Sequence, residues 1–326
     1  MDGAAITSDD LANAPDLDTL TERLAAKGMT PGWIDRDEPI LWPEPKTAFT
    51  PAHWKWTECR AAMDGAARLI DTTLAERRNL ILRNPVPGND IATARTLVNA
   101  YQTILPGETA RSHRHAPHAL RVILESSGAW SVVNGDKHPM ETGDIVLTPG
   151  QSWHGHGHDG DDQAYWLDGL DVPLVHLVEP MFVEGHPDGM ERIVRDGSNS
   201  PFRFTWEMTQ ANLDKAEDDP EGFYGRHIHY DTSDTMPTIG ITVQRLESGF
   251  RSRRYRSTAN TVYAVMQGEG QSTIDGQAID WSFGDTFVAP CWKSIEHQAT
   301  GDSVLFAMSD EPVMRFCKYW KFEALD

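Results

Sequence analysis

The stretch GETARSHRH at residues 107–115 decides the fold, together with GDIVLTPGQSWHGHGH at residues 143–158. Glycine and proline predict turns in both stretches, and the histidines recur at every second position. Alternate residues of a β-strand point to the same face, so His113 and His115 both reach inward while Arg114 points away. A histidine from the later strand, which carries His154, His156 and His158, would add a third imidazole. We therefore predict two strands of one β module that present three nitrogens on one face.

Three imidazoles on one face predict a metal site, with His113 and His115 as two of the ligands and a histidine of the later strand as the third. Neutral imidazole binds iron, copper, nickel and zinc, and a facial set of three ligands leaves positions open for substrate and oxygen. The alternative is that these histidines hold no metal. Their common frame, with Gly107 before the pair and Pro149 before His154, favours the metal.

The β pattern occurs twice along the chain. A shift of 142 residues places Gln102 on Gln244, and a shift of 141 residues places Pro149 on Pro290. We therefore expect two copies of one module. In the second copy the three ligand positions are changed to Tyr255, Ser257 and Ile295. We expect one metal per chain, in the first copy, and a structural or rim-forming role for the second.

The rest of the chain is organised around these two copies. We predict an N-terminal helical segment over 1–78, a metal-binding module over 79–183, a connector over 184–238 and a second module over 239–326. Helical spacing of apolar residues predicts helices before Gly28, over about 54–77 and over 206–215. Short apolar runs separated by turns predict antiparallel strands elsewhere, with a hairpin at Asn134-Gly135.

Composition limits the partners of the protein. The 326 residues include 29 Lys and Arg against 49 Asp and Glu, a net charge of −20. Nucleic acid and anionic membranes repel such a chain, so neither is expected as a partner. The three cysteines show no metal-ligand spacing, and no secretory signal or membrane span is evident. We expect a cytoplasmic protein with reduced thiols.

The motifs Gly107-x5-His113-x-His115 and Gly143-x5-Pro149 resemble those of cupins, and two such modules in one chain resemble a bicupin. Four stretches are more specifically similar to gentisate 1,2-dioxygenase and its relatives: residues 102–108, 113–121, 153–158 and 166–174. Those relatives act on salicylate, substituted salicylates and 1-hydroxy-2-naphthoate.

This resemblance implies both the fold and the chemistry. The fold is dominated by β structure, with two β-barrel or jelly-roll cupin modules and N-terminal helices. The cofactor is Fe(II), one per chain, held by His113, His115 and His154. The family lacks the glutamate ligand of many cupins, and Ala119 and Leu120 stand in its place here. The implied reaction is extradiol-type cleavage of gentisate (2,5-dihydroxybenzoate) by O2, between the carboxyl- and hydroxyl-bearing carbons, to give maleylpyruvate.

Two further candidates follow the histidines along their strands. Arg121 lies six residues after His115 and shares its face if the strand is unbroken. Its planar fork matches a carboxylate, and the resemblance implies that it binds the substrate carboxylate. His156 follows His154 by two residues, which suits a general acid or base near the substrate hydroxyl. A surface arginine and a merely packed histidine are the alternatives.

The resemblance implies two more catalytic residues. Asp168 would orient a histidine, as carboxylates beside metal sites do, and Gln102 would face substrate or oxygen. A turn aspartate and an ordinary polar strand residue remain alternatives. Arg77 and Arg78 resemble an arginine pair of the family's pocket, although a helix end also attracts cations.

Gentisate is the expected substrate, with salicylate, 5-substituted salicylate and 1-hydroxy-2-naphthoate as alternatives. Gly155 stands where gentisate enzymes carry aspartate, which predicts a less polar or roomier pocket. A more distant alternative is a cupin without oxygenase activity, either a ligand-binding module or an isomerase. By resemblance the chain forms a homo-oligomer, with a tetramer favoured.

Overall fold

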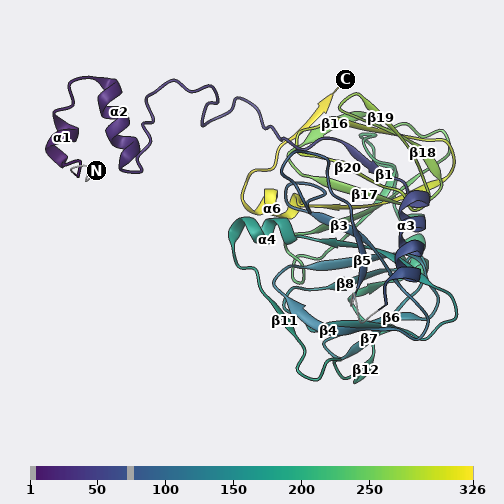
Figure 1. Ribbon diagram of the computed structural model, residues 1–326. Helices are drawn as coiled ribbons and strands as arrows, with labels where there is room; N and C mark the ends of the chain where they lie inside the picture. The colour runs from purple at the N-terminus through teal and green to yellow at the C-terminus, as the bar shows by residue number, and fades with distance from the viewer. Residues whose placement is uncertain (1–4, 72–76, 326) are drawn as a thin grey trace. The chain divides into compact units, whose positions relative to one another are not determined.

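The computed structural model describes residues 5–71 and 77–325. The chain forms two compact units, Met1–Glu44 and Pro45–Asp326. The first unit contains α1 (Ser8–Ala12) and α2 (Leu17–Ala26), drawn in purple in Figure 1. The second unit contains both β modules. The boundaries of the four segments predicted from the sequence remain a prediction.

Helix α2 confirms the helix expected before Gly28. The side chain of Asp16 accepts a hydrogen bond from the backbone N–H of Thr19 at 2.7 Å and caps the first turn. Gly28 ends the helix with φ +71°, a left-handed conformation that favours glycine. No helix among the described residues is long and apolar enough to cross a membrane.

Two sheets form the first module, and their strand pairs are antiparallel except for one parallel pair at a sheet edge (Figure 1). Its elements are β2 (Arg78–Ile81), β3 (Val98–Ile104), β4 (Thr109–His115), β5 (Ala119–Glu125), β6 (Ala129–Val133), β7 (Asp136–Met140), β8 (Ile145–Thr148), β9 (His154–His158), β10 (Ala164–Leu170) and α4 (Val172–Val178). The connector adds β11 (Val183–Gly185), β12 (Arg195–Asp196) and β13 (Arg203–Phe204). In hydrogen-bonded order the sheets are β13-β8-β5-β10-β3-β2 and β11-β4-β9-β6-β7-β12.

The second module repeats this arrangement. Its elements are β14 (Arg226–Tyr230), β15 (Gly240–Leu246), β16 (Arg254–Ser257), β17 (Thr261–Gln267), β18 (Glu269–Ile274), β19 (Gln277–Ser282), β20 (Thr286–Ala289), β21 (Ile295–Ala299), β22 (Ser303–Ser309), α6 (Glu311–Phe316) and β23 (Phe322–Leu325). Its sheets run β1-β20-β17-β22-β15-β14 and β19-β18-β21-β16-β23. This order matches that of the first module, except that β12 has no counterpart in the second. The match confirms the two cupin-type modules predicted from the repeat.

The structural repeat includes one more strand at its start than the sequence shift revealed. In each module, this outer strand comes from a segment outside the module's own run of sequence. β1 (Ala52–Trp54) precedes the first module but pairs with β20 of the second. β13 precedes the second module but pairs with β8 of the first. Each borrowed strand leads into a helix that starts at a tryptophan, α3 (Trp56–Leu69) or α5 (Trp206–Lys215). The modules are therefore interlocked by exchanged strands.

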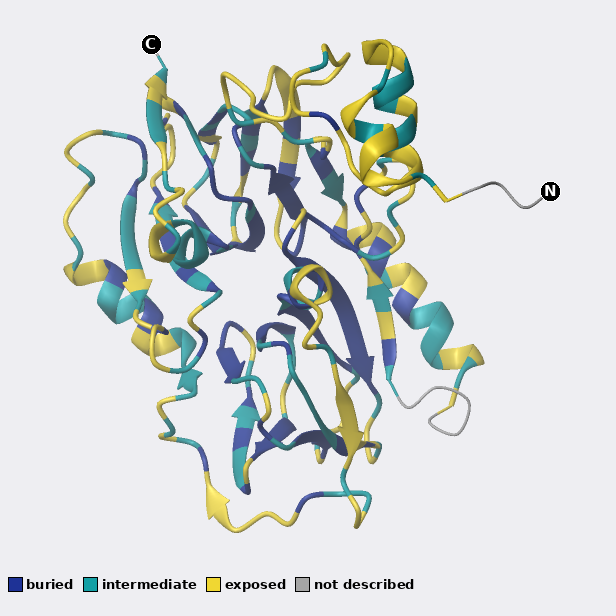
Figure 2. Cartoon of the chain, turned by 90° about the vertical axis from the view of Figure 1, so that its left-hand side faces the viewer, coloured by how far each residue is buried: buried dark blue, intermediate teal, exposed yellow. Residues whose placement is uncertain are grey.

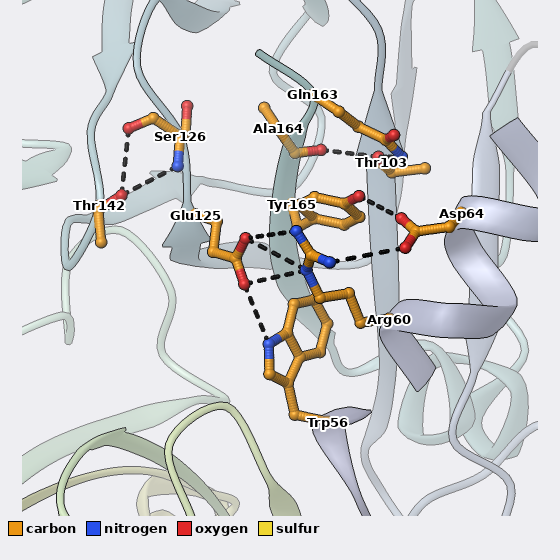
Figure 3. A network of polar contacts seen from close by, with 10 residues as sticks. All are labelled: Trp56, Arg60, Asp64, Thr103, Glu125, Ser126, Thr142, Gln163, Ala164 and Tyr165. Atoms are coloured by element: carbon orange, nitrogen blue, oxygen red, sulfur yellow. Dashed lines mark hydrogen bonds and ion pairs between the residues drawn. The ribbon is translucent and has the colours of Figure 1, made fainter. Parts of the chain in front are cut away.

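Equivalent aspartates hold the starts of these helices. The carboxylate of Asp285 accepts the backbone N–H of Trp56 at 2.7 Å, and that of Asp144 accepts the backbone N–H of Trp206 at 2.9 Å. Helix α3 is also fixed to the first module, where Arg60 forms a bidentate ion pair with Glu125 (Figure 3). Thus α3 links both modules.

Helix α3 is shorter than the predicted helix over 54–77. It ends at Leu69, whose side chain is 71% exposed, so the apolar stripe stops there; residues 72–76 lie outside the described chain. The predicted hairpin is confirmed, with positive φ at both Asn134 (47°) and Gly135 (85°). The predicted helix over 206–215 is α5.

A matched pair of buried carboxylates joins the modules. Asp171 accepts the backbone N–H of His118 at 2.8 Å and the hydroxyl of Thr238 at 2.5 Å. Asp310 accepts the backbone N–H of Asn260 at 2.7 Å and the hydroxyl of Thr96 at 2.5 Å. In each case the threonine belongs to the segment leading into the other module's β-strands. The strands that carry or adjoin these contacts, β3 and β5 in the first module and β15 and β17 in the second, are mostly buried (Figure 2).

Because Asp171 satisfies two donors in a buried position, Asp171→Ala is expected to lower the free energy of unfolding by about 2 kcal/mol or more. Urea denaturation followed by circular dichroism measures this. Asp310→Ala, the equivalent change, should cost a similar amount, whereas the exposed Asp188→Ala should cost less than about 0.5 kcal/mol. Equal stability of all three variants would show that these carboxylates do not join the modules.

Candidate metal centre and active site

Three histidines converge from neighbouring strands of the first module. His113 and His115 lie on β4, and His154 lies on β9, directly opposite His113 in the antiparallel register. One ring nitrogen from each lies within 4.8 Å of the others, which is close enough to share one metal ion. The predicted ligand face is therefore present in the structure.

Backbone carbonyls orient two of these rings. Nδ1 of His115 lies 2.8 Å from the carbonyl oxygen of Pro117, and Nδ1 of His154 lies 3.0 Å from that of Ser152. A carbonyl only accepts, so each Nδ1 carries the proton and each Nε2 keeps its lone pair. Such outer hydrogen bonds fix the tautomer and the angle of metal-binding imidazoles.

The surroundings keep the imidazoles neutral. Burial, assisted by the positive charges of Arg77 and Arg121, lowers the pKa of His113 to about 3 and that of His115 to about 4. Burial likewise holds the pKa of His154 well below its ordinary value. A metal ligand must be deprotonated, so no proton has to be displaced here at neutral pH. An all-nitrogen set of three neutral donors fits a divalent transition metal such as iron.

Arg121 lies beside this face on β5 and is 3% exposed. Its Nη1 donates to the hydroxyl of Thr148 at 2.6 Å, and its Nε lies 3.4 Å from a carboxylate oxygen of Asp168, its partner across β5 and β10. Burial raises the pKa of Asp168 to about 6, against the opposing effect of Arg121. Asp168 also accepts from the indole of Trp166 at 3.1 Å. It therefore holds the arginine, where the sequence analysis expected it to hold a histidine.

The other two candidates are also buried inside the module. His156 on β9 is 1% exposed, and its Nδ1 has no hydrogen-bond partner among the described residues. Burial keeps its pKa well below the ordinary value, so it is a neutral base or donor. Gln102 on β3 is 4% exposed and faces Trp166 across β3 and β10. The barrel thus gathers all the candidates from its strands.

Arg77 and Arg78, which the sequence analysis could not assign to the pocket or to a helix end, have different roles in the structure. Arg78 forms a bidentate ion pair with Glu108, with both nitrogen–oxygen distances 2.6 Å, and so ties β2 to the turn before β4. Arg77 instead acts electrostatically on His113, Arg121 and Asp168, which places its charge near the site. Sequence reasoning missed Thr148 as a partner of Arg121, because nothing in the chain marks that pairing.

Gly155 does not line the site. A Cβ at this position would lie 2.5 Å from Oγ of Ser112 and 2.9 Å from Sδ of Met190, on the opposite face of β9 from His154 and His156. An aspartate here would point away from the histidines. The expectation of a less polar or roomier pocket at Gly155 is therefore not supported.

A model of the cupin domain matches residues 100–171. Gentisate 1,2 dioxygenase 1 of Aquipseudomonas alcaligenes is 33% identical to this chain, and the match covers 92% of this chain and 94% of that protein. The chain belongs to the gentisate and salicylate 1,2-dioxygenase family. It is therefore a bicupin enzyme and a ring-cleaving 1,2-dioxygenase.

Other family members cover nearly the whole chain. A 5-aminosalicylate 1,2-dioxygenase of Comamonas sp. is 32% identical over 96% of this chain and 92% of its own. The salicylate 1,2-dioxygenase of Pseudoaminobacter salicylatoxidans, solved as a mutant in complex with gentisate, matches with a TM-score of 0.87. It is 27% identical, and the match covers 96% of both chains.

If the three histidines hold the metal, the iron content of His115→Ala and of His154→Ala should fall at least about 10-fold below that of the wild type. Changing a residue that only hydrogen-bonds to a metal ligand already costs about 10-fold in metal affinity. Elemental analysis after anaerobic loading and desalting measures the content. His176→Ala, an exposed histidine outside the site, serves as the control. Full iron content in both site variants would place the metal elsewhere.

Proposed function

We propose that this protein is an Fe(II)-dependent dioxygenase that cleaves gentisate to maleylpyruvate, with His113, His115 and His154 as the iron ligands. The observation that carries the proposal is the face of three neutral imidazoles beside the buried Arg121. Three nitrogens leave room on a metal for both an aromatic hydroxy acid and O2. Iron(II), when bound, supplies the redox chemistry that lets O2 react with an electron-rich ring.

Arg121 binds the carboxylate of the substrate in this proposal. Its Nη1 donates to the hydroxyl of Thr148, and its Nε forms an ion pair with Asp168 at 3.4 Å without a hydrogen bond, so the two contacts hold the guanidinium in place. The remaining nitrogen, Nη2, is then available to a ligand carboxylate. A charge-assisted hydrogen bond inside a buried barrel is stronger than one in water. Thr148 and Asp168 act as positioning residues.

His156 and Gln102 complete the site. The neutral imidazole of His156 can take the proton of the hydroxyl next to the carboxylate, which makes the ring more electron-rich. Gln102 offers an amide to the substrate or to O2. Arg77 adds a positive charge that favours an anionic substrate over a neutral one.

Gentisate is favoured over other hydroxy acids by the relatives. The similar enzymes from Aquipseudomonas alcaligenes and Streptomyces sp. carry the name gentisate dioxygenase, and the solved salicylate enzyme binds gentisate. Salicylate, 5-substituted salicylate and 1-hydroxy-2-naphthoate are the alternatives, since enzymes named for 5-aminosalicylate and 1-hydroxy-2-naphthoate are also 32% and 28% identical. A homotetramer and the cytoplasmic location remain predictions.

Anaerobically iron-loaded protein should consume O2 with gentisate, and the absorbance of a ring-opened keto acid should rise in parallel. An oxygen electrode with gentisate, salicylate, 5-aminosalicylate and 1-hydroxy-2-naphthoate in parallel ranks the substrates. His113→Ala should abolish uptake, and His176→Ala should not change it. Uptake with another substrate in the panel would reassign the substrate, and no uptake with any would reject the oxygenase function.

Arg121→Lys should lower kcat/KM for gentisate by about 100-fold, because lysine cannot keep both the contacts with Thr148 and Asp168 and a contact with the substrate. Iron content should stay at the wild-type level. The exposed Arg83→Lys is the matched control and should behave like wild type. An unchanged kcat/KM in Arg121→Lys would remove this residue from substrate binding.

A further inference from the structure

The second module contains a cavity of about 300 Å³ in the position that corresponds to the metal site of the first. Gln244 corresponds to Gln102 by the shift of the repeat, and Tyr255 and Ser257 replace the first two histidines. Tyr263 lies opposite Ala307 in β17 and β22, as Arg121 lies opposite Asp168 in β5 and β10. All five of these second-module residues line the cavity.

We propose that this cavity is a second binding site, for a neutral phenol that carries no carboxylate. It is separate from the iron site and does not depend on the function proposed above. A volume of about 300 Å³ is at the lower end of small-molecule sites and suits a single aromatic ring.

An unsatisfied acceptor marks the inner wall of the cavity. Gln244 is 1% exposed, and its Oε1 has no hydrogen-bond partner among the described residues. A buried amide oxygen without a partner costs free energy, which a ligand hydroxyl would recover by donating to it. The neighbouring phenol groups of Tyr255 and Tyr263 lie 3.3 Å apart, so they are already partnered by one another.

The walls suit an aromatic ring. Tyr255 stacks on Phe322 with ring centroids 5.2 Å apart, and Tyr224 packs at 5.4 Å from Tyr255. All three line the cavity together with Trp320. Aromatic side chains favour ring ligands through stacked and edge contacts.

The charges around the cavity disfavour an acid. The carboxylate of Asp219 is held by the backbone N–H groups of Phe223 (2.8 Å) and Tyr224 (3.0 Å), and Glu311 is paired with Arg315 at 2.6 Å. Glu221 adds a further negative charge to the lining. Three carboxylates against the one arginine, Arg315, make the lining net negative, so it repels an anion. The first module, with Arg77 and Arg121, has the opposite preference.

Fluorine NMR with 4-fluorophenol and iron-loaded protein under argon tests the proposal. Wild type should bind the probe saturably with a Kd of about 1 mM or tighter, and gentisate should not displace it. Gln244→Leu should weaken binding at least about 10-fold, since it removes the acceptor and leaves the shape similar. Gln102→Leu, the equivalent change in the first module, should leave the Kd of the probe unchanged.

Ala307→Leu supplies an independent variant, because it fills the cavity without removing the amide of Gln244, and it should also abolish binding of the probe. Both second-module variants should keep the iron content of wild type, which shows that they fold. The proposal would be overturned by no saturable binding in wild type, by displacement of the probe by gentisate, or by an unchanged Kd in either Gln244→Leu or Ala307→Leu. Saturable binding of myo-inositol in place of the phenol would also overturn it and assign a polyol instead.

Discussion

The antiparallel pairing of β4 with β9 is the constraint on which the rest of the site depends. It places His113 opposite His154, and the alternation of side chains along β4 adds His115 to the same face. A slip of one residue in this register would turn the histidines out of the barrel. The carbonyls of Pro117 and Ser152 then set the angle of the rings, so strand geometry and local hydrogen bonds together produce the ligand face.

The two modules share one fold, but the side chains inside them differ in charge and in hydrogen-bonding groups. Apart from β12, which has no counterpart in the second module, the strand order is the same in both copies. Each copy also has one of the two buried aspartates that join the modules, Asp171 and Asp310. The interior side chains differ: His113, His115 and Arg121 of the first module correspond to Tyr255, Ser257 and Tyr263 in the second, whereas Gln102 and Gln244 are the same residue type. The backbone hydrogen bonds that hold the barrel do not use these interior side chains, so the interior is free to diverge.

Much of the site was predictable from the sequence because its logic is local. The alternation at His113, His115, His154 and His156 needs only the period of a strand. The parity argument for Arg121 assumed one unbroken strand and was wrong on that point, because His115 ends β4 and Arg121 lies on the next strand, β5. Partners across strands were not predictable in this way. The contact of Asp168 with Arg121 depends on the β5–β10 register, and the different roles of Arg77 and Arg78 depend on where Glu108 lies. The direction of Gly155 was equally hidden until Ser112 and Met190 were placed around it.

The repeat in the sequence predicted the two modules. It did not predict the exchange of strands, because β1 and β13 are too short to show an alternating pattern. Their exchange has a consequence for synthesis on the ribosome. β1 is translated ahead of every other strand described in the second unit, yet its partner β20 is among the last to emerge. The edge of β1 must therefore remain unpaired while most of the chain is made. The second module, although it has lost the metal ligands, is needed for this reason: deleting it would leave β1 as an open edge that invites aggregation.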